Sequence, residues 1–308
     1  MTKSNVIHIA CALNDYYVMP YGVMLVSLLE NNKKHKIHIH VFSGQLNNTS
    51  IKSLENIARK YHAGFTFYPL DDKEFQNLAI SDRISRVTYY RDVIPGKISP
   101  EIEKILYLDG DMIVLGDISE LWNTNIDNYI VATVDDLYAI HCREFDRLKI
   151  PEKYGYFNSG LFLINRNEWV KNNISQKIFD YTRENIANLK FLDQDVENYV
   201  MHTQRKVIDQ KWNQQVGLYF MRSGFNNPDY SEKTLEEVKS KPVIVHFNGV
   251  EKPWNYVNLH PFKKEFNRYL KISGFKKLDE QVTLRKIAKK VVYRTMGWSW
   301  WNRIKKNV

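Results

Sequence analysis

The first 70 residues alternate between short apolar runs of strand length and longer amphipathic runs of helix length. The runs of strand length are residues 6–13, 36–44 and 64–70, and residues 36–44 alternate apolar and polar side chains with a period of two. Residues 20–32 and 49–62 have the pattern of helices, the second with Thr49 or Ser50 as its expected N-cap. This β-α-β-α-β order predicts parallel strands joined by right-handed crossovers, and therefore an α/β fold.

The rest of the chain extends the same pattern. Further strands are expected at residues 104–108, 129–136, 159–165 and 241–249, and helices over roughly 174–200 and 261–272. Residues 104–108 are almost continuously apolar, which is typical of a strand covered on both faces. We find no linker before residue 270. The sequence therefore predicts one α/β domain over residues 1–270, followed by a tail over residues 271–308.

Length and composition exclude several other classes of protein. A chain of 308 residues with 44% apolar residues can bury a large core, and its 13 Gly and 9 Pro lie in no repeat. No uncharged apolar run reaches the length of about 18 residues that a membrane-spanning helix needs. His8 interrupts the apolar N-terminal run, which indicates a first strand and not a signal peptide. Cys11 and Cys142 lack metal-binding spacing, which favours a reducing, cytoplasmic location.

The positive charge of the chain is concentrated at its C-terminus. Eight basic and no acidic residues follow residue 280: Arg285, Lys286, Lys289, Lys290, Arg294, Arg303, Lys305 and Lys306. Subtracting these eight from the net charge of +9 leaves +1 for residues 1–280. A nucleic-acid-binding protein, the contrasting class that the excess of basic residues suggests, would carry basic residues across the folded body, so we expect no nucleic-acid partner.

The tail also has the pattern of a membrane-associated helix. On a helical wheel of residues 284–295 the basic residues fall on one half and the apolar residues on the other, and Trp298, Trp300 and Trp301 follow. A basic amphipathic helix followed by indoles is typical of a segment in a membrane interface. We therefore expect residues 281–308 to bind an anionic membrane surface, and the protein to be peripheral on the inner face of the cell membrane. The alternative is a helix docked on the domain with a solvated charged face.

Two carboxylates follow the expected strand at residues 104–108. Asp109, Gly110 and Asp111 leave the C-terminal end of this strand, the edge at which open α/β sheets bind ligands. Two carboxylates one residue apart on a turn can share a divalent cation and leave coordination positions open for phosphate oxygens. The pattern recurs at residues 193–195, and a solvated turn after a strand would have the same sequence.

A second polar turn ends the late strand. His246 has the chemistry of a third ligand to manganese or a similar ion. Gly249 would let the backbone approach a phosphate, and Lys252 would offer it a cation. A buried core histidine followed by a surface loop is the alternative interpretation.

Three more polar turns could line a pocket. Asp193, Gln194 and Asp195 lie at an expected helix N-terminus, where aspartate is also favoured by the helix dipole, so one of the two is expected to have a capping role. Asn158, Ser159 and Gly160 enter a strand, and turn chemistry alone could explain them. Asn14 and Tyr17 follow the first strand, and Tyr17 could stack on a nucleotide base.

Five motifs in one order carry a resemblance to a known family. They are ALNDYY, Arg91 in TYYRD, LYLDGDM, YFNSGLFLIN together with DQD, and HFNGVEKPWN. Over roughly residues 5–262 the chain resembles glycosyltransferase family 8, which includes bacterial lipopolysaccharide α-galactosyl- and α-glucosyltransferases and glycogenin. The resemblance implies the GT-A fold, a mixed and mainly parallel sheet flanked by helices. The first turn departs from the Asp-Asp-Asn-Tyr of the lipopolysaccharide enzymes, and its Asn14-Asp15 is closer to glycogenin.

The resemblance implies a role for individual residues. Asp109, Asp111 and His246 match the metal ligands, for Mn2+ or Mg2+, and Gly110 lies between the two carboxylates. Ala12, Asn14 and Tyr17 match the uridine-binding turn. Arg91 matches a donor-contacting arginine, and Gly249 and Lys252 match the loop over the diphosphate. The residues around the transferred sugar are matched by Asn158, Ser159, Asp193 and Gln194, and a looser match places Asp135 near the acceptor.

The implied reaction transfers galactose or glucose from a UDP-sugar to a glycan acceptor, with retention of configuration. The acceptor would be a cell-surface polysaccharide or lipopolysaccharide. A protein or self-glycosylating transferase, as glycogenin is, is a close variant. Retention permits a carboxylate nucleophile, for which Asp193 is a candidate, or attack by the acceptor on the leaving-group face. Because an amide such as Gln194 is a poor nucleophile and no carboxylate is clearly placed, we favour the second route.

Overall fold

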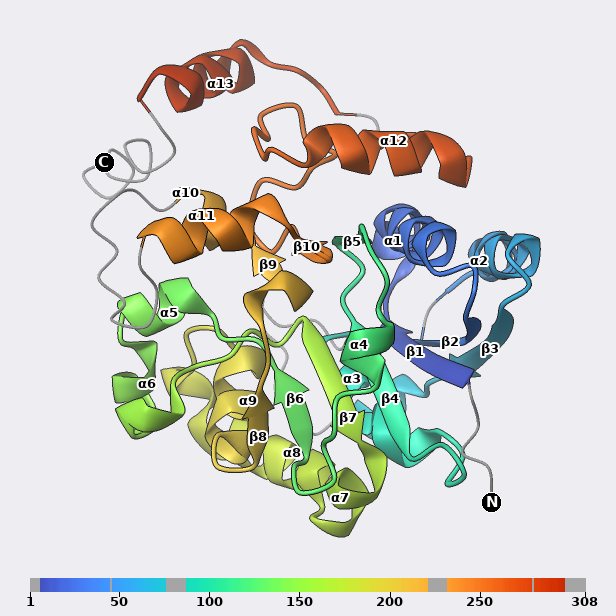
Figure 1. The fold of residues 1–308 in the computed structure, drawn as a ribbon, viewed down its shortest axis with the longest axis vertical. Coiled ribbons are helices and arrows are strands. Elements are labelled where there is room, and N and C mark those ends of the chain that lie inside the picture. The colour runs from blue at the N-terminus through green and yellow to red at the C-terminus, as the bar shows by residue number, and fades with distance from the viewer. Residues whose placement is uncertain (1–5, 45, 76–86, 221–231, 279, 297–308) are drawn as a thin grey trace.

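The computed structural model describes residues 6–44, 46–75, 87–220, 232–278 and 280–296, and a seven-stranded sheet runs through its centre (Figure 1). The strand order is β3-β2-β1-β4-β7-β6-β8. The strands are β1 (Val6–Ala12), β2 (Lys36–Ser43), β3 (Gly64–Pro69), β4 (Lys104–Leu108), β6 (Val131–Thr133), β7 (Leu161–Asn165) and β8 (Arg205–Val207). All neighbouring pairs are parallel except those of β7, which is antiparallel to β4 and β6. The predicted parallel α/β sheet is therefore confirmed, with one reversed strand.

A second, three-stranded sheet adjoins the end of β4. It consists of β5 (Met112–Val114), β10 (Ile244–His246) and β9 (Gln214–Gln215), with β10 in the centre. The pairing of β10 with β5 is antiparallel and sets His246 opposite Met112. This register brings the end of β10 beside the Asp109–Asp111 turn, which lies between β4 and β5.

Helices cover both faces of the central sheet (Figure 1). One face packs against α1 (Val18–Asn31), α2 (Asn48–Lys60) and α12 (Lys263–Ser273), and the other against α3 (Val87–Lys97), α7 (Arg166–Lys171), α8 (Ile174–Asn185) and α9 (Asp193–Met201). The remaining helices are α4 (Ser119–Trp122), α5 (Leu137–His141), α6 (Glu144–Arg147), α10 (Val216–Phe220), α11 (Glu232–Ser240) and α13 (Leu284–Met296). Alternate residues of β1 face opposite layers, since Ile7 and Ile9 join the first core and Ala10 the second.

Two local predictions are wrong. The helical pattern over residues 174–200 is divided into α8 and α9, and Leu192 before α9 has a φ of 50°. The break is stabilised by Asp195, whose Oδ2 accepts hydrogen bonds from the backbone N–H groups of Lys190 and Phe191. The N-cap of α2 is Asn47, whose side chain accepts from the N–H of Ser50, and not Thr49 or Ser50.

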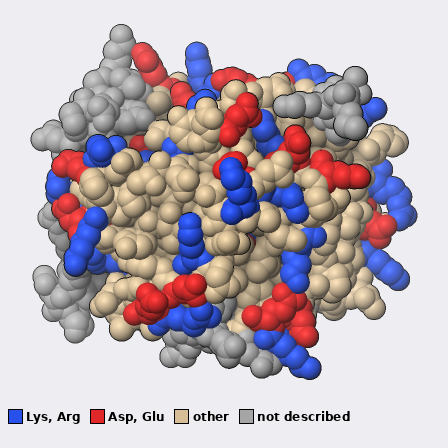
Figure 2. Space-filling model, turned by 90° about the horizontal axis from the view of Figure 1, so that it is seen from below, with Lys and Arg blue, Asp and Glu red and all other residues tan. Residues whose placement is uncertain are grey.

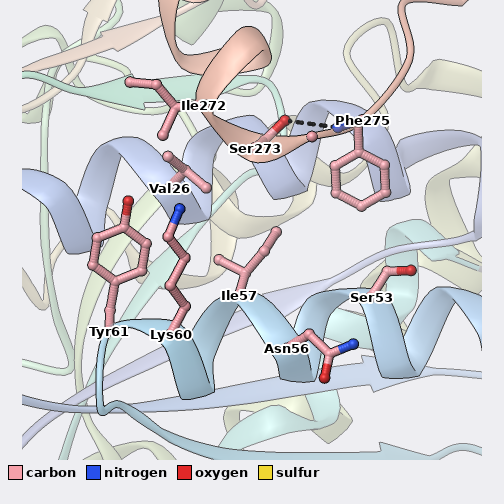
Figure 3. Close-up of a pocket in the computed structure, with 10 residues that line it drawn as sticks. Val26, Ser53, Asn56, Ile57, Lys60, Tyr61, Ile272, Ser273 and Phe275 are labelled. Atoms are coloured by element: carbon pink, nitrogen blue, oxygen red, sulfur yellow. Dashed lines mark hydrogen bonds between the residues drawn. The ribbon is translucent and has the colours of Figure 1, made fainter.

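The described surface offers no long basic tract on the face drawn in Figure 2, where Lys and Arg side chains are interspersed with Asp and Glu. A hollow of about 330 Å³ lies between α1, α2 and residues 272–275 (Figure 3). Its lining side chains, among them Asn56, Lys60 and Tyr61, come from none of the motifs singled out in the sequence. Among the described residues, no helix is long and apolar enough to cross a membrane.

Three histidines from β1 and β2 lie together on the sheet. The Nδ1 of His8 is 3.0 Å from the Nε2 of His40, and the rings of His38 and His40 stack with centroids 4.5 Å apart. Burial, with the neighbouring imidazoles, lowers the pKa of His8 to about 4 and that of His40 to about 3, and burial lowers the pKa of His38. The folded protein therefore holds these rings neutral.

We predict that acid destabilises the fold through this cluster. Below the ordinary histidine pKa of about 6.5 the unfolded chain takes up protons that the folded chain rejects, so the free energy of unfolding falls as the pH drops from about 6.5 to about 4. His40→Gln should reduce this fall. Urea midpoints at about pH 7 and about pH 5 measure it. An equal fall in midpoint for the variant and the unchanged protein would contradict the assignment.

Candidate active site

The turn after β4 presents two carboxylates at the edge of the central sheet. The backbone N–H of Asp109 donates to the carbonyl of Gly160 (2.9 Å), and Asp109 Oδ1 accepts from the Tyr107 hydroxyl (2.7 Å). The carbonyl of Asp111 accepts from the N–H of Phe247 (2.9 Å). Both carboxylates are thus held by backbone contacts to the strands on either side, and the predicted position after a buried strand is confirmed.

His246 completes a cluster of three potential metal ligands. Its Nε2 lies 3.3 Å from Asp111 Oδ1 and 3.7 Å from Asp109 Oδ2. One ligand atom from each of the three residues lies within 4.8 Å of the other two. Among the described residues this is the one group of three or more such side chains that could hold a metal ion. The sequence-predicted residues are therefore brought together.

Two asparagines orient the imidazole. His246 Nδ1 lies 3.1 Å from the Oδ1 atoms of both Asn158 and Asn213. Asn158 Oδ1 also accepts from the N–H of Gly160, which fixes this atom as the oxygen. Nδ1 is consequently a donor, and Nε2 is the ring nitrogen that faces Asp109 and Asp111. Two carboxylates and this ring nitrogen converge at one point, an arrangement that can hold a cation.

Gly160 makes the approach of these side chains possible. A Cβ at this position would lie 2.3 Å from Cε1 of His246 and 3.0 Å from Asp109 Oδ2. Because the first distance is far below van der Waals contact, only glycine fits beside the imidazole. The cluster of Asp109, Asp111 and His246 therefore requires glycine as the last residue of the Asn-Ser-Gly turn.

Lys252 lies against the same carboxylate. Its Nζ donates to Asp111 Oδ2 (2.5 Å) and to the carbonyl of Phe247 (2.8 Å). Burial would raise the pKa of the Asp111 carboxyl, but Lys252 and His246 outweigh burial and hold that pKa below its usual range. Asp111 is therefore ionised, the form in which a carboxylate can bind a metal ion.

Arg91 connects three of the predicted motifs. The guanidinium extends from α3, donates to the carbonyl of Ser159 and to Asp193 Oδ2 (2.5 Å), and lies 4.0 Å from Asp109 Oδ1. Burial raises the pKa of the Asp193 carboxyl, and Arg91 opposes that rise. The arginine thus fixes the positions of the carboxylates at the sheet edge relative to each other.

A buried acid pair beneath Arg91 was not found from the sequence. Asp92 and Glu197 are fully buried, and Glu197 Oε1 lies 3.5 Å from Arg91 Nε. Burial raises the pKa of Asp92 to about 7, although Arg91 opposes it, and burial also raises the pKa of Glu197. One guanidinium cannot neutralise every surrounding carboxylate, and burial therefore favours the protonated form in this pair.

Gln194 lies at the centre of a hydrogen-bonded group beside Asp193. Its Oε1 accepts from Asn158 Nδ2 (3.0 Å) and from the N–H of Ser159 (3.3 Å), and its Nε2 donates to Asp136 Oδ2 (3.2 Å). The expected capping role of one of the two aspartates is not found, because the N-cap of α9 is Leu192 and no side chain caps this helix end. Asp195 is buried and supports the loop before α9, while Asp193 is oriented by Arg91.

The turn after β1 lies beside the Asp109–Asp111 turn. Ala12 is the last residue of β1, and the Asn14 side chain accepts from the N–H of Tyr17 (3.2 Å). A Cβ on Gly110 would lie 3.4 Å from the Tyr17 ring, so this aromatic ring lies beside the Asp109–Asp111 turn. Tyr17 also meets Trp254 edge-on, with ring centroids 6.2 Å apart.

Several residues of the site escaped sequence reasoning. Asn213 contacts His246, and Asp136, not Asp135, contacts Gln194. Asp135 instead pairs with Arg205 (2.6 Å). The two aspartates are adjacent, and only the position of Asp136 as the N-cap of α5, accepting from the N–H of Ala139, distinguishes them. No motif around Asn213 marked it.

Comparison with known proteins identifies the family. A family model described as Glycosyl transferase family 8 matches residues 8–258. The chain belongs to glycosyltransferase family 8. It is 33% identical over 276 residues to general stress protein A of Bacillus subtilis, a match that covers 88% of this chain and 95% of the relative. It is 28% identical to a lipopolysaccharide 1,2-glucosyltransferase of Escherichia coli, covering 93% and 84% of the two chains.

A solved structure agrees with the fold. The crystal structure of galactosyltransferase LgtC with donor and acceptor sugar analogues superposes with a TM-score of 0.77 at 19% identity, covering 92% of this chain and all of LgtC. The family 8 chain therefore has the GT-A fold, a mixed and mainly parallel sheet flanked by helices, as the sequence predicted. It is a glycosyltransferase.

We predict that Gly160→Ala weakens metal binding. The added methyl group would displace the His246 ring, so Mn2+ affinity, measured by titration calorimetry, should fall about 10- to 100-fold. Gly96→Ala is the matched control, because a Cβ there meets nothing within 4 Å. Unchanged Mn2+ affinity in the Gly160 variant would show that the imidazole takes no part in the site.

Proposed function

We propose that this family 8 enzyme is a retaining, metal-dependent hexosyltransferase that moves galactose or glucose from a UDP-sugar to a glycan acceptor. The observation that carries the proposal is the convergence of Asp109, Asp111 and His246 Nε2 at the sheet edge, with Lys252 beside them. A nucleotide-sugar transferase needs a positive charge at this point, where the diphosphate leaves.

The side chains fit a divalent cation, and Mn2+ or Mg2+ is the proposed ion. Two carboxylates and one imidazole are a donor set that Mn2+ accepts, and Asn158 and Asn213 hold the imidazole in the metal-binding tautomer. A cation held by Asp109, Asp111 and His246 would stabilise the departing diphosphate without transferring a proton.

The chain's own residues would bind and orient the donor. The Lys252 ammonium, now on Asp111, is close enough to the cluster to bind phosphate oxygens, and Gly249 lies in the same loop. Tyr17 would stack on uracil beside Gly110, with Ala12 and Asn14 in the same turn. Arg91 would hold Asp193 towards the sugar, next to Asn158, Ser159 and Gln194.

For retention we propose attack by the acceptor on the face that the diphosphate leaves. Gln194 Oε1 already accepts two hydrogen bonds, and Asp193 Oδ2 is paired with Arg91, which makes both oxygens poorer nucleophiles. The departing phosphate oxygen would then take the proton of the acceptor hydroxyl. In this role Gln194 positions the sugar and stabilises the positive charge that develops on it.

The acceptor that we propose is a glycan of cell-surface polysaccharide or lipopolysaccharide. The support is the likeness to the lipopolysaccharide glucosyltransferase. We further propose a catalytic domain of residues 1–270 that works in the cytoplasm, attached to the inner face of the cell membrane through residues 281–308 of the tail 271–308. The eight basic residues of this tail support the attachment. Trp298, Trp300 and Trp301, with Arg303, Lys305 and Lys306, lie outside the described residues.

We predict that the reaction depends on the metal cluster. Excess EDTA should abolish release of UDP from the donor sugar, and Mn2+ should restore it. Asp111→Asn should lower kcat by about a hundredfold or more, because the cation loses a charged ligand. An unchanged circular dichroism spectrum would show that the variant folds. Full turnover in EDTA would exclude the metal-dependent mechanism.

We also predict an α-glycoside product from an α-linked UDP-sugar, read from the anomeric proton by NMR. Gln194→Ala should lower kcat less than Asp111→Asn does, because Gln194 only positions and stabilises. A β-linked product would refute retention. Equal losses in the two variants would refute the supporting role of Gln194.

A further inference from the structure

Helix α13 presents two different faces. Leu284, Ile287 and Val291 form an apolar stripe whose members are 84%, 41% and 55% exposed. On the other face Lys286, Lys289 and Lys290 are only partly exposed and Tyr293 is buried. In Figure 1 the helix lies beyond α12, away from the central sheet. Three of the five cations that the helical wheel placed together thus turn towards the protein and not towards solvent.

The inner face of α13 contacts residues 251–256. Lys289 Nζ forms an ion pair with Glu251, and these two side chains are 20% and 17% exposed. Lys290 Nζ lies 3.9 Å from the centre of the Tyr256 ring. Lys286 pairs with Glu280 (2.8 Å), whose Oε2 accepts from the N–H of Tyr256. A hollow of about 420 Å³ remains between the helix and this segment.

The segment that α13 holds carries Lys252. Glu251 immediately precedes Lys252, which donates to Asp111 in the ligand cluster. Before Glu251, the Val250 side chain is 84% exposed and so packs against little of the protein. The carbonyl of Glu251 accepts from Asn258 Nδ2 (2.6 Å), but its side chain is held by Lys289. The hollow extends to Tyr16 and Trp254, next to Tyr17.

We propose that Lys289 is a positioning residue that, through Glu251, holds Lys252 at the diphosphate, and that an anionic bilayer covers the apolar stripe of α13. The charge of the tail favours this occupant, since residues 281–308 carry no acidic residue and, on α13, Arg285 and Arg294 stay exposed while three lysines turn inwards. A helix held by the bilayer on one side and by Glu251 on the other would couple membrane attachment to donor binding. The coupling rests on the proposed function.

The test compares two variants that each remove one positive charge from α13. Lys289→Met breaks the pair with Glu251, whereas Arg285 is exposed and makes no contact described for this helix, so Arg285→Met is the matched control. With a soluble acceptor, Lys289→Met should raise the KM for the UDP-sugar about three- to tenfold and leave kcat nearly unchanged. Arg285→Met should keep the original KM, and an equal KM in both variants would overturn the positioning role.

A charge exchange separates a specific pair from a general loss of stability. Glu251→Lys combined with Lys289→Glu should return the KM towards its original value, which a merely destabilised helix would not do. The bilayer is tested by co-sedimentation with vesicles of phosphatidylglycerol and phosphatidylcholine. Leu284→Gln with Val291→Gln should reduce binding, and anionic vesicles should lower the KM of the unchanged protein. Failure of the unchanged protein to bind these vesicles would overturn the proposed occupant.

Hydrogen exchange distinguishes failure of this inference from failure of the proposed function. Backbone amides of residues 247–256 should exchange faster in Lys289→Met than in Arg285→Met, whatever the substrate is. Faster exchange in a protein that uses no UDP-sugar would retain the contact and reject the proposed function. Equal exchange in the two variants would reject the contact as a positioning device.

Discussion

The buried guanidinium of Arg91 is the interaction on which the candidate site depends. It is the cation at the point where the Asp109 turn, the carbonyl of Ser159 and the N-terminus of α9 meet, and its side chain is 9% exposed. A charge so far from water is stable only when it is paired and hydrogen-bonded. The carboxylates around it exceed it in number, and burial raises the pKa of Asp92 and of Glu197, which opposes that imbalance. The geometry of the candidate site and the stability of the core therefore depend on the same group of residues.

The pairing of β10 with β5 is the second constraint. It places His246 opposite Met112, next to the Asp111 carboxylate, and the N–H of Phe247 then binds the Asp111 carbonyl. A shift of one residue would turn the imidazole to the other face of the strand. Gly160 excludes any side chain from the space that the ring occupies. Backbone pairing and one missing Cβ thus determine the position of the third ligand.

Much of the fold and of the candidate site could be predicted from the sequence. The physical reasons differ between the strands and helices, the loop before α9 and the buried polar residues. Strand and helix periods are local, so β1 to β4 and the ends that carry Asp109 and His246 were foreseen closely. The break between α8 and α9 was not, because it depends on Asp195 binding backbone groups that only the folded chain brings to it. Asp92, Glu197 and Asn213 were missed since their roles arise from burial, which no spacing in one sequence reveals. The helical wheel of residues 284–295 correctly separated the polar from the apolar residues of α13. It could not indicate that Lys289 pairs with Glu251, which is distant in the sequence.

The distance along the chain between the ligands has a consequence for synthesis. Lys252 follows Asp111 by 141 residues, and His246 belongs to β10, which follows every strand of the central sheet along the chain. A nascent polypeptide ending before β10 would expose Asp109 and Asp111 without their third ligand, and could hold a cation only weakly. Long-range pairing of this kind is slow because loop closure precedes the contacts that reward it. The proposed metal site can therefore be complete only after β10 has been synthesised, when the strands of the central sheet are already part of the chain.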